Sequence, residues 1–281
     1  MLKRTRFAPS PTGPLHLGHA YAALVAAGRA DPGQFLLRIE DLDAERSKPQ
    51  WEGAIYDDLG WLGLDWQRPV LRQSERRDAY QDALGRLVAM GLCYPCSCSR
   101  ADIRAALSAP QEGAPAIGPD GPVYPGTCRH RRMAEAGPSD AIRLDMRAAI
   151  DRVGARMPRF QEAGPTHAGL HILDKDHMIS DVGDVVLSRR VIGPAYHLAV
   201  TVDDAFQQIS EVTRGEDLFE ATRIHVLLQQ LLGVPTPAYF HHPLIRDPAG
   251  RRLAKRDDAR ALSLYRAEGL TPRDIKAKIG L

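Results

Sequence analysis

Two histidines stand where a loop meets a predicted helix, a position that suits the phosphates of a nucleotide. His16 and His19 enclose Leu17 and Gly18, after a proline-rich loop and before an alanine-rich stretch with high helix propensity, residues 20–30. Backbone N–H groups at the start of a helix attract anions, so a triphosphate fits here. Gly18 has no side chain, which leaves room for an adenine or ribose against the backbone. Two histidines beside a loop are nevertheless often ordinary surface residues, so the motif alone is modest support.

A basic segment near the end of the chain supplies a second group suited to phosphate chemistry. Residues 252–256 read Arg-Leu-Ala-Lys-Arg and follow a hairpin-like turn predicted at residues 244–250. Lys255 is the candidate to approach the charge that develops on a leaving pyrophosphate. Basic loops are usually just solvated, so this segment gains weight only together with the first one.

In this order, the two segments resemble the signature motifs of the class I aminoacyl-tRNA synthetases, a pair of histidines and a mobile lysine loop. Longer matching stretches narrow the resemblance to the glutamyl branch; they are residues 6–13, 38–41 and 212–217. The resemblance implies that His16, His19 and Lys255 are catalytic and that, with Gly18, they bind ATP. Ala254 departs from the pattern, because the family commonly has a serine there, and this would remove a hydroxyl contact.

The same resemblance implies a pocket for glutamate, which carries two carboxylates and one ammonium group. Arg6, Arg214 and Tyr196 match carboxylate-binding positions, while Glu40 matches the partner of the ammonium group, with Ser10 beside it. Arginine suits this task because its planar guanidinium binds a carboxylate through two hydrogen bonds. Without the family match, structural ion pairs, a surface carboxylate and a half-buried core ring are the more ordinary interpretations of these residues.

All four cysteines lie in one short region, which in a reducing compartment favours a metal over disulfides. Alternation along an extended segment puts Cys96 and Cys98 on one face and Cys93 on the other, and Cys128 supplies a third thiolate. The similar glutamyl-queuosine synthetases complete the site with a tyrosine four residues before the last cysteine, here Tyr124. Cys93 is the rival fourth ligand. Thiolates select zinc, and a closed site would be structural, although four buried free thiols stay an alternative.

The elements that must position these residues read as an α/β fold with a parallel sheet. Residues 4–9 form a predicted strand that Pro9 ends, and with the next helix and a strand at residues 34–39 they give a βαβ unit. Further helices are predicted at residues 51–62, 76–90 and 221–232, and further extended segments at residues 94–98, 196–202 and 208–212. We expect a doubly wound, Rossmann-type nucleotide-binding domain with its active site at the strand ends.

An insertion interrupts this domain. We expect the Rossmann-type catalytic domain at residues 1–92 and 195–238, a zinc-containing, tRNA-contacting subdomain at 93–194, and the lysine loop with a short helical segment at 239–281. Residues 110–126 are rich in proline and glycine, so few regular elements are expected there. Only 25 residues follow Arg256. Since a domain usually needs at least about 50 residues, no anticodon-binding domain is expected.

The composition is that of a globular protein without a membrane segment. Hydrophobic residues make up 44% of the chain, and no apolar run approaches the roughly 20 residues of a transmembrane helix. The basic N-terminus leads into Pro9 and Pro11, not into a signal-peptide apolar segment, so we expect a cytoplasmic protein without a membrane partner, and a monomer. The net charge is only +2, so nucleic acid must be bound by local basic patches.

The truncated core and the cysteine pattern resemble the glutamyl-queuosine synthetases, and this resemblance implies a particular acceptor. That family attaches glutamate to queuosine, a hydroxylated base in the anticodon of aspartate tRNA. We therefore expect formation of glutamyl adenylate from ATP, with Mg²⁺ as the counter-ion of ATP, and transfer of glutamate to queuosine in tRNA(Asp). Arg129, Arg131 and Arg132 are candidates to hold stem phosphates, although a solvated charge run is the commoner explanation.

Three alternatives stay open at this point. A truncated glutamyl-tRNA synthetase would charge the 3′ end of a tRNA. A nucleotidyltransferase with the class I fold would adenylylate a phosphate-bearing metabolite, but it does not explain the matches at Arg6, Glu40 and Arg214. A catalytically inert, RNA-binding paralogue has only Ala254 in its favour.

Overall fold

Parallel strands at the start of the chain form the first part of the catalytic sheet. In the computed structural model, which describes residues 2–107, 117–190, 193–245 and 260–281, β1 (Thr5–Phe7), β2 (Phe35–Ile39) and β3 (Gln67–Arg72) pair in the order β1-β2-β3, all parallel. The connections are α1 (Leu17–Arg29) and α2 (Pro49–Trp61). Both strands of the predicted βαβ unit are buried throughout, as expected for a parallel sheet covered on both faces. The predicted α/β class is therefore confirmed.

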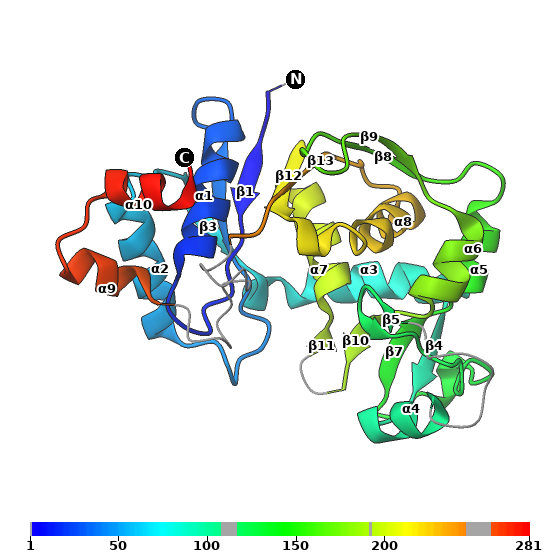
Figure 1. Ribbon diagram of the computed structural model, residues 1–281. Helices are drawn as coiled ribbons and strands as arrows, with labels where there is room; N and C mark the ends of the chain where they lie inside the picture. Colours follow the sequence, from blue (N-terminus) through cyan, green and yellow to red (C-terminus); the bar gives the residue numbers. More distant parts are fainter. Residues whose placement is uncertain (1, 108–116, 191–192, 246–259) are drawn as a thin grey trace.

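Four later strands continue the architecture on the other side of β1 (Figure 1). They pair in the order β12-β13-β8-β9 and are β12 (Glu211–Gly215), β13 (Ala238–His242), β8 (Arg159–Glu162) and β9 (Gly169–Ile172). The first three run parallel to their neighbours, and β9 runs antiparallel to β8. The backbone N–H groups of Ser210 and Glu211 both donate to the carbonyl of Arg4, which joins the start of β12 to β1.

A separate antiparallel sheet lies at the far end of the molecule, below α3 in Figure 1. Its order is β11-β10-β7-β4, and its strands are β11 (Gly193–Pro194), β10 (Val186–Arg189), β7 (Ala141–Leu144) and β4 (Cys93–Cys96). The remaining two strands form a short ladder, β5 (Ile117–Gly118) with β6 (Gly121–Pro122). The latter pair lies in the proline- and glycine-rich stretch, where few regular elements were expected.

The other α-helices surround these sheets. They are α3 (Arg77–Ala89), α4 (Arg100–Leu107), α5 (Met146–Val153), α6 (Lys175–His177), α7 (Tyr196–Phe206), α8 (Thr222–Leu232), α9 (Leu262–Ala267) and α10 (Pro272–Ile279). Ser99 and Asp102 exchange hydrogen bonds at the start of α4, the arrangement typical of a capping box. The C-terminal α10 buries Ile275 and Ile279 in the same apolar cluster as α1, so the helical tail packs on the nucleotide-binding half.

One predicted strand is wrong: residues 196–202 form the first two turns of α7. Residues 197–201 are all buried, so the segment has no exposed face, and its pattern does not distinguish a buried helix from a buried strand. Gln208, which adopts a positive φ of 54°, follows the helix, and β12 consequently begins at Glu211, three residues later than the predicted strand.

The division of the chain into domains stays a prediction. The β8–β9 hairpin falls inside the expected insertion, residues 93–194, yet it pairs with β13 in the sheet that also holds β12. Of the hairpin-like turn predicted at residues 244–250, only the first two residues are among those described. Within the described part of the chain, no helix is both long and apolar enough to cross a membrane.

Candidate active site and cysteine cluster

The histidine motif forms the start of α1. His16 is the N-cap residue: its Nδ1 accepts from the N–H of Gly18 at 3.1 Å, and its own N–H donates to Nδ1 of His19 at 3.2 Å. The two rings lie 3.8 Å apart between centroids. Because each Nδ1 is an acceptor, each neutral ring carries its proton on Nε2, where it can donate to an anionic oxygen. Together with the helix N-terminus, this arrangement suits a phosphate.

The candidate lysine lies outside the described residues. Lys255 belongs to the stretch 246–259, so its side chain cannot be placed beside the histidines. The segment that follows is placed: Ala261 bridges to His16, and the N–H of Leu262 donates to the carbonyl of Leu15 at 2.8 Å. The chain therefore returns from residues 246–259 directly onto the histidine motif.

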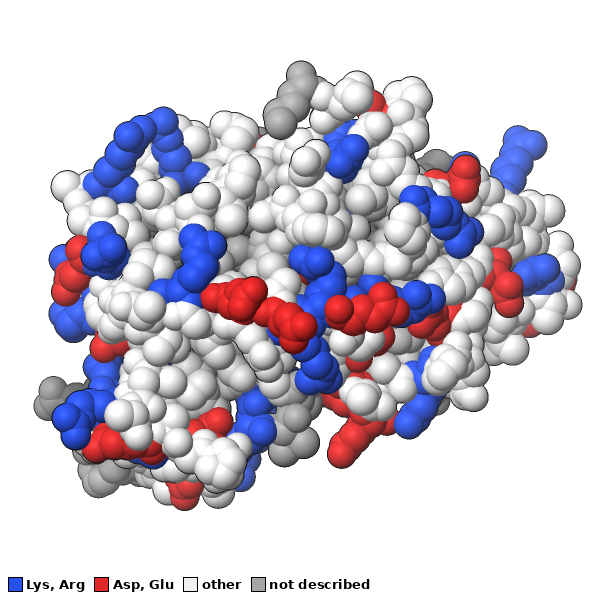
Figure 2. Space-filling view, turned by 180° about the vertical axis from the view of Figure 1, so that it is seen from behind, with Lys and Arg blue, Asp and Glu red and all other residues white. Residues whose placement is uncertain are grey.

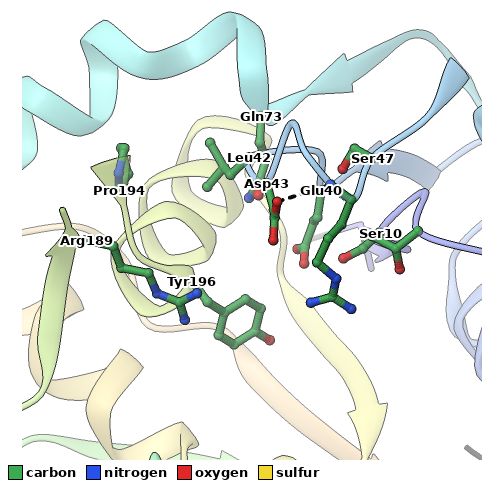
Figure 3. Close-up of a pocket in the computed structure, with 11 residues that line it drawn as sticks. Ser10, Glu40, Leu42, Asp43, Ser47, Gln73, Arg189, Pro194 and Tyr196 are labelled. Carbon is green, nitrogen blue, oxygen red and sulfur yellow. Dashed lines mark hydrogen bonds between the residues drawn. The ribbon is translucent and has the colours of Figure 1, made fainter. Parts of the chain in front are cut away.

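A cavity of about 200 Å³ opens beside the loop that follows β1. Its walls come from that loop, from the residues after β2 and from the segment before α7; the lining residues are Ser10, Thr12, Glu40, Leu42, Asp43, Arg46, Ser47, Gln73, Arg189, Pro194 and Tyr196. Glu40 and Tyr196 point toward the same space in Figure 3. Three of the five predicted glutamate-binding residues, Ser10, Glu40 and Tyr196, thus line one cavity.

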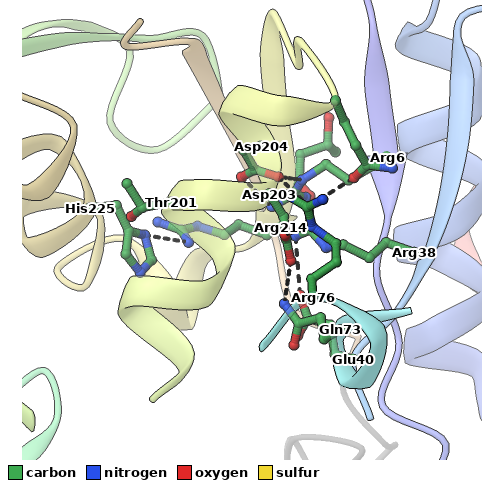
Figure 4. A network of polar contacts seen from close by, with 12 residues as sticks. Arg6, Arg38, Glu40, Gln73, Arg76, Thr201, Asp203, Asp204, Arg214 and His225 are labelled. Atoms are coloured by element: carbon green, nitrogen blue, oxygen red, sulfur yellow. Dashed lines mark hydrogen bonds and ion pairs between the residues drawn. The ribbon is translucent and has the colours of Figure 1, made fainter. Parts of the chain in front are cut away.

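Arg6, the fourth predicted residue, is held by an acidic partner that the sequence interpretation did not include. Its Nε and Nη2 lie 2.9 and 3.2 Å from the two carboxylate oxygens of Asp204, and its Nη1 donates to the carbonyl of Thr213. Asp204 also accepts from Arg38 at 2.6 Å, and Arg38 donates to Glu40 at 3.1 Å (Figure 4). Arg6 and Glu40 are therefore parts of one buried network of alternating charges.

Burial and these neighbours set the protonation of Glu40. Burial raises the pKa of Glu40, and the guanidinium groups of Arg38 and Arg6 oppose this shift without cancelling it. An additional positive partner, such as an ammonium group, would stabilise the carboxylate of Glu40, because a nearby positive charge favours the charged form.

Arg214, the fifth predicted residue, is a buried guanidinium whose hydrogen-bond partners among the described residues are all neutral. Nε lies 3.1 Å from Nε2 of His241, Nη1 lies 3.0 Å from Nδ1 of His225, and Nη2 donates to Thr222 at 2.6 Å. No ion pair of Arg214 with a carboxylate is present among the described residues, although its side chain lies in a site only 7% exposed. A buried cation of this kind suits an anionic ligand.

Arg6 and Arg214 both act electrostatically on Tyr196, which lines the cavity. Burial raises the pKa of Tyr196, and Arg214, Glu40 and Arg6 all lie close enough to modify it. Four of the five predicted glutamate-binding residues therefore share one electrostatic environment, and the fifth, Ser10, lines the same cavity as Glu40 and Tyr196.

Several residues of this environment were not predicted from the sequence: Arg38, Glu162, Asp204, His225 and His241. The side-by-side aspartates at the end of an apolar run, Asp203 and Asp204, were a usable signal, because buried carboxylates are almost always paired. No comparable signal marks the two histidines, which lie in an amphipathic helix and an ordinary strand.

The cysteine cluster lies where β4 ends. The sulfur atoms of Cys96, Cys98 and Cys128 all lie within 4.8 Å of one another. The hydroxyl of Tyr124 lies 3.4 Å from the sulfur of Cys96 and 3.3 Å from that of Cys98. Cys93 is buried in the main apolar cluster instead, where burial raises the pKa of its thiol to about 12.

This geometry fits a structural metal ion. A tetrahedral zinc site with Zn–S bonds of about 2.3 Å separates its sulfur ligands by about 3.8 Å; the sulfurs of Cys98 and Cys128 lie 3.5 Å apart, and all three lie within 4.8 Å of one another. Tyr124 is placed to supply the fourth ligand atom. A closed site of this kind would tie β4 to the segment around residue 128 and would have no open position for catalysis.

The basic residues that the sequence suggested for nucleic acid are paired with acids. Their nitrogen–oxygen distances are 2.8 Å for Arg129 with Asp184, 2.8 Å for Arg131 with Asp140 and 3.9 Å for Arg132 with Glu135. Figure 2 likewise shows basic and acidic side chains intermixed across the face seen from behind.

Another set of arginines lines a second cavity, of about 590 Å³, beside the cysteine cluster; they are Arg100, Arg104, Arg143, Arg189 and Arg190. Two acids, Asp120 and Asp184, share its lining. Arg189 also lines the cavity of Glu40 and Tyr196, so the two cavities meet at this side chain. Arg189 is therefore a basic side chain common to both cavities.

Comparison with known proteins gives consistent matches over nearly the whole chain. The family described as "tRNA synthetases class I (E and Q), catalytic domain" matches residues 3–280. The glutamyl-Q tRNA(Asp) synthetase of Rhodobacter capsulatus is 61% identical over 282 aligned positions, which cover 99% of both chains. The protein of the same name from Symbiobacterium thermophilum is 42% identical and is covered over 83% of its length.

Solved structures agree with these matches. A glutamate tRNA ligase from Elizabethkingia meningosepticum, determined in complex with its amino acid, aligns with a TM-score of 0.68 and 29% identity over 92% of this chain. The chain spans 53% of the length of that ligase. A methionyl-tRNA synthetase from Mycobacterium tuberculosis aligns with a TM-score of 0.60 at 12% identity, which supports the fold alone.

Proposed function

Because this chain belongs to the class I tRNA synthetases of the glutamate and glutamine group, we propose that it activates glutamate with ATP and transfers it to queuosine in the anticodon of tRNA(Asp). The relative from Rhodobacter capsulatus, whose name specifies glutamyl-Q and tRNA(Asp), supports this acceptor because it is 61% identical over 99% of the chain. The chemistry is that of a ligase of the aminoacyl-tRNA synthetase type.

The observation that carries the proposal is that two buried groups of opposite charge, Arg214 and Glu40, both act electrostatically on Tyr196, which lines the cavity together with Glu40. Arg214 has only neutral hydrogen-bond partners among the described residues, and a positive neighbour would stabilise the charged form of Glu40. Glutamate carries charges complementary to both. Tyr196, Ser10 and Arg6 complete the set of groups that would hold it.

Activation is an in-line displacement at the α-phosphorus of ATP. A carboxylate oxygen of glutamate forms a bond to this phosphorus, and the bond to the bridging oxygen breaks, so that pyrophosphate leaves. The protein supplies positions and positive charge and no covalent nucleophile. We assign His16, His19 and Lys255 to the stabilisation of the phosphates, with Gly18 at the nucleotide and Mg²⁺ as the counter-ion of ATP.

Transfer then needs a hydroxyl of the acceptor at the same place. A cyclopentene hydroxyl of queuosine attacks the carbonyl carbon of the adenylate, an ester bond forms, and AMP leaves. The arginine-lined cavity meets the glutamate cavity at Arg189, so Arg100, Arg104 and Arg190 are our candidates for contacts with the phosphates that flank this nucleotide.

Zinc has a structural role in this proposal. Cys96, Cys98, Cys128 and Tyr124 would hold it and so fix β4 against the segment around residue 128, next to the arginine-lined cavity. No chemical step involves this site.

A first experiment tests activation. ATP–pyrophosphate exchange without tRNA should run with glutamate and not with glutamine or aspartate, because a neutral amide leaves a buried guanidinium unpaired and a shorter side chain cannot reach both ends of the pocket. Equal exchange with glutamine would contradict the assignment of this pocket.

A second experiment tests the acceptor. Labelled glutamate is incubated with tRNA(Asp) from queuosine-producing and from queuosine-deficient cells, and nuclease digestion then locates the label. We expect label only in the first preparation and on the anticodon nucleotide. Label on the terminal adenosine, or equal labelling of both preparations, would instead support an enzyme that charges the 3′ end of a tRNA.

A further inference from the structure

The guanidinium of Arg214 faces two imidazoles, and its hydrogen bonds determine the state of both. All N–H groups of arginine are donors, so each ring nitrogen that faces Arg214 must be an acceptor. These nitrogens are Nε2 of His241, 3.1 Å from Nε, and Nδ1 of His225, 3.0 Å from Nη1. A protonated imidazole on either side would bring two donors and two positive charges together.

The first imidazole is fixed from behind by a buried acid. Nδ1 of His241 lies 2.6 Å from Oε2 of Glu162, and both side chains are at most 1% exposed. Nδ1 therefore carries the proton and donates it to the carboxylate, which leaves Nε2 as the acceptor for Arg214. Although burial by itself would raise the pKa of Glu162, hydrogen bonds from His241 outweigh it and lower that pKa.

The orientation of Glu162 is fixed in turn by the backbone. Its other oxygen, Oε1, accepts from the N–H of His241 at 2.9 Å and from the N–H of Gly164 at 2.6 Å. A β-carbon on Gly164 would lie 2.3 Å from the carbonyl oxygen of His241, so the turn that delivers this N–H has no space for a side chain. The acid cannot rotate to exchange its two oxygens without losing both backbone bonds.

The second imidazole is fixed by a longer route. Nε2 of His225 lies 3.0 Å from Nδ1 of His197, and Nε2 of His197 lies 3.6 Å from Oδ1 of Asp120. Since Nδ1 of His225 accepts from Arg214, its Nε2 carries the proton and donates to Nδ1 of His197, whose own Nε2 then carries a proton and faces the carboxylate of Asp120. Burial and the charge of Arg214 lower the pKa of His225 well below its ordinary value, which keeps the ring neutral.

We propose that Glu162 and Asp120 determine, through these imidazoles, how Arg214 binds its ligand, and that His241 and His225 are positioning residues. Each acid selects the tautomer whose lone pair faces the guanidinium. Arg214 is thereby oriented by three neutral acceptors, and two of its five N–H groups, one on each terminal nitrogen, are left for a carboxylate. This inference rests on the proposed function, since it assumes that the carboxylate belongs to glutamate.

A comparison with Arg6 shows what the imidazoles achieve. Arg6 contacts Asp204 directly, so its charge is offset by a carboxylate of the protein. With neutral rings in between, no acid in the described part of the chain contacts Arg214, so the ligand would supply the carboxylate that offsets its charge. A charge-assisted bond to a preorganised, buried guanidinium is stronger than one to a guanidinium that already binds an acid.

The test is Glu162→Gln, which changes one atom. The backbone N–H groups of His241 and Gly164 need the amide oxygen, so the amide NH₂ must take the place of Oε2 and face Nδ1 of His241. His241 must then carry its proton on Nε2, where it opposes the N–H of Arg214. We expect the KM for glutamate in pyrophosphate exchange to rise about tenfold or more, with the KM for ATP changed by less than about threefold.

A spectroscopic measurement separates this effect from a general loss of structure. The ¹⁵N chemical shifts of the histidine side chains should report a proton on Nδ1 of His241 in the original chain and on Nε2 in Glu162→Gln. A raised KM with an unchanged tautomer, or a changed tautomer with an unchanged KM, would overturn the proposal.

A second pair of variants keeps the test independent of the folding of Glu162→Gln. His225→Leu removes the acceptor that faces Arg214 and should raise the KM for glutamate, whereas His225→Gln offers an amide oxygen and should restore most of that loss. The matched control is Glu211→Gln, a buried acid of the same strand as Arg214 that binds Arg29 at the opposite end, and it should leave the KM unchanged.

The outcomes also distinguish the inference from the proposed function. If the original chain shows no glutamate-dependent exchange, the proposed function fails, and this inference fails with it. If exchange is present but both Glu162→Gln and His225→Leu have the original KM, only the positioning roles are refuted.

Discussion

Arg6 and Asp204 form an ion pair with two contacts, in which Nε lies 2.9 Å from Oδ1 and Nη2 lies 3.2 Å from Oδ2. Asp204 also binds Arg38 at 2.6 Å, and all three side chains are at most 7% exposed. One carboxylate of α7 therefore joins β1 to β2 at the strand ends that bear the candidate site.

The first prediction concerns this carboxylate. Asp204→Asn removes the negative partner of two buried guanidinium groups, so it should lower the free energy of unfolding by about 3–5 kcal/mol. Urea unfolding at pH 7 measures the change. The control is Asp151→Asn, whose partner Lys175 and own side chain are both more than half exposed; it should change stability by less than about 0.5 kcal/mol.

The same residue predicts a pH dependence. Burial alone would raise the pKa of Asp204, but Arg6 and Arg38 outweigh it and lower the pKa to about 2. The folded chain thus binds fewer protons than the unfolded chain, whose aspartates titrate near 3.9. The stabilisation is present in full above about pH 4 and is lost as the pH falls through about 2. In Asp204→Asn this part of the dependence of the unfolding free energy on pH should be absent, and an unchanged dependence would argue against the ion pair.

The location of the part of the site near the N-terminus could be predicted from the sequence, because a strand, a loop, a helix and a second strand follow one another directly there. A short strand, a loop and a helix put Arg6 and His16 at neighbouring ends of a parallel unit, and the second strand ends beside Glu40. The order of these elements predicts that the site lies at one edge of the parallel sheet, whereas the roles of Arg6, His16 and Glu40 were implied only by the resemblance to the family.

The surroundings of Arg214 could not be predicted in the same way. Its partners come from α8 and β13, and the acid behind His241 is Glu162 of β8, which lies 79 residues before His241 and within the expected insertion. Such contacts depend on how separate segments pack. The strand predicted at residues 196–202 is wrong for a related reason. Burial on all sides removes the repeat of buried and exposed residues that distinguishes a helix from a strand.

The second prediction concerns catalysis. Lys255→Ala should lower the rate of pyrophosphate exchange about a hundredfold or more, because it removes a positive charge that would stabilise the transition state. The binding of glutamate should be retained. His16→Ala and His19→Ala should likewise lower kcat more than they raise KM. Lys276→Ala, in α10, is the matched control and should behave like the original chain. An unchanged rate in Lys255→Ala would refute the catalytic role of Lys255.

The third prediction is one zinc ion per chain. Elemental analysis should find one equivalent, and Cys96→Ser, Cys98→Ser and Cys128→Ser should each lose it, because these sulfurs already lie within 4.8 Å of one another. Cys93→Ser should retain the metal, since Cys93 is buried in the apolar core. If Cys93→Ser loses the metal while Tyr124→Phe retains it, Cys93 and not Tyr124 is the fourth ligand.

The last prediction concerns the nucleic-acid surface. Arg129 and Arg131 each lie 2.8 Å from a carboxylate, whereas the arginine-lined cavity shares Arg189 with the glutamate cavity, so we expect tRNA phosphates to contact the arginines of that cavity. The double variant Arg100→Ala/Arg104→Ala removes two of them from one exposed helix without altering the glutamate cavity.

In that variant, tRNA-independent pyrophosphate exchange should be unchanged, whereas the KM for tRNA(Asp) should rise about tenfold. Each lost phosphate contact should also reduce the slope of log K against log salt by about 1, because fewer counterions are released on binding. Arg132→Ala is the control, since this residue is exposed in the same part of the chain and does not line the cavity. If Arg132→Ala weakens transfer and the double variant does not, the acceptor approaches along the opposite side of the insertion, and the sequence-based assignment of the phosphate contacts is the better one.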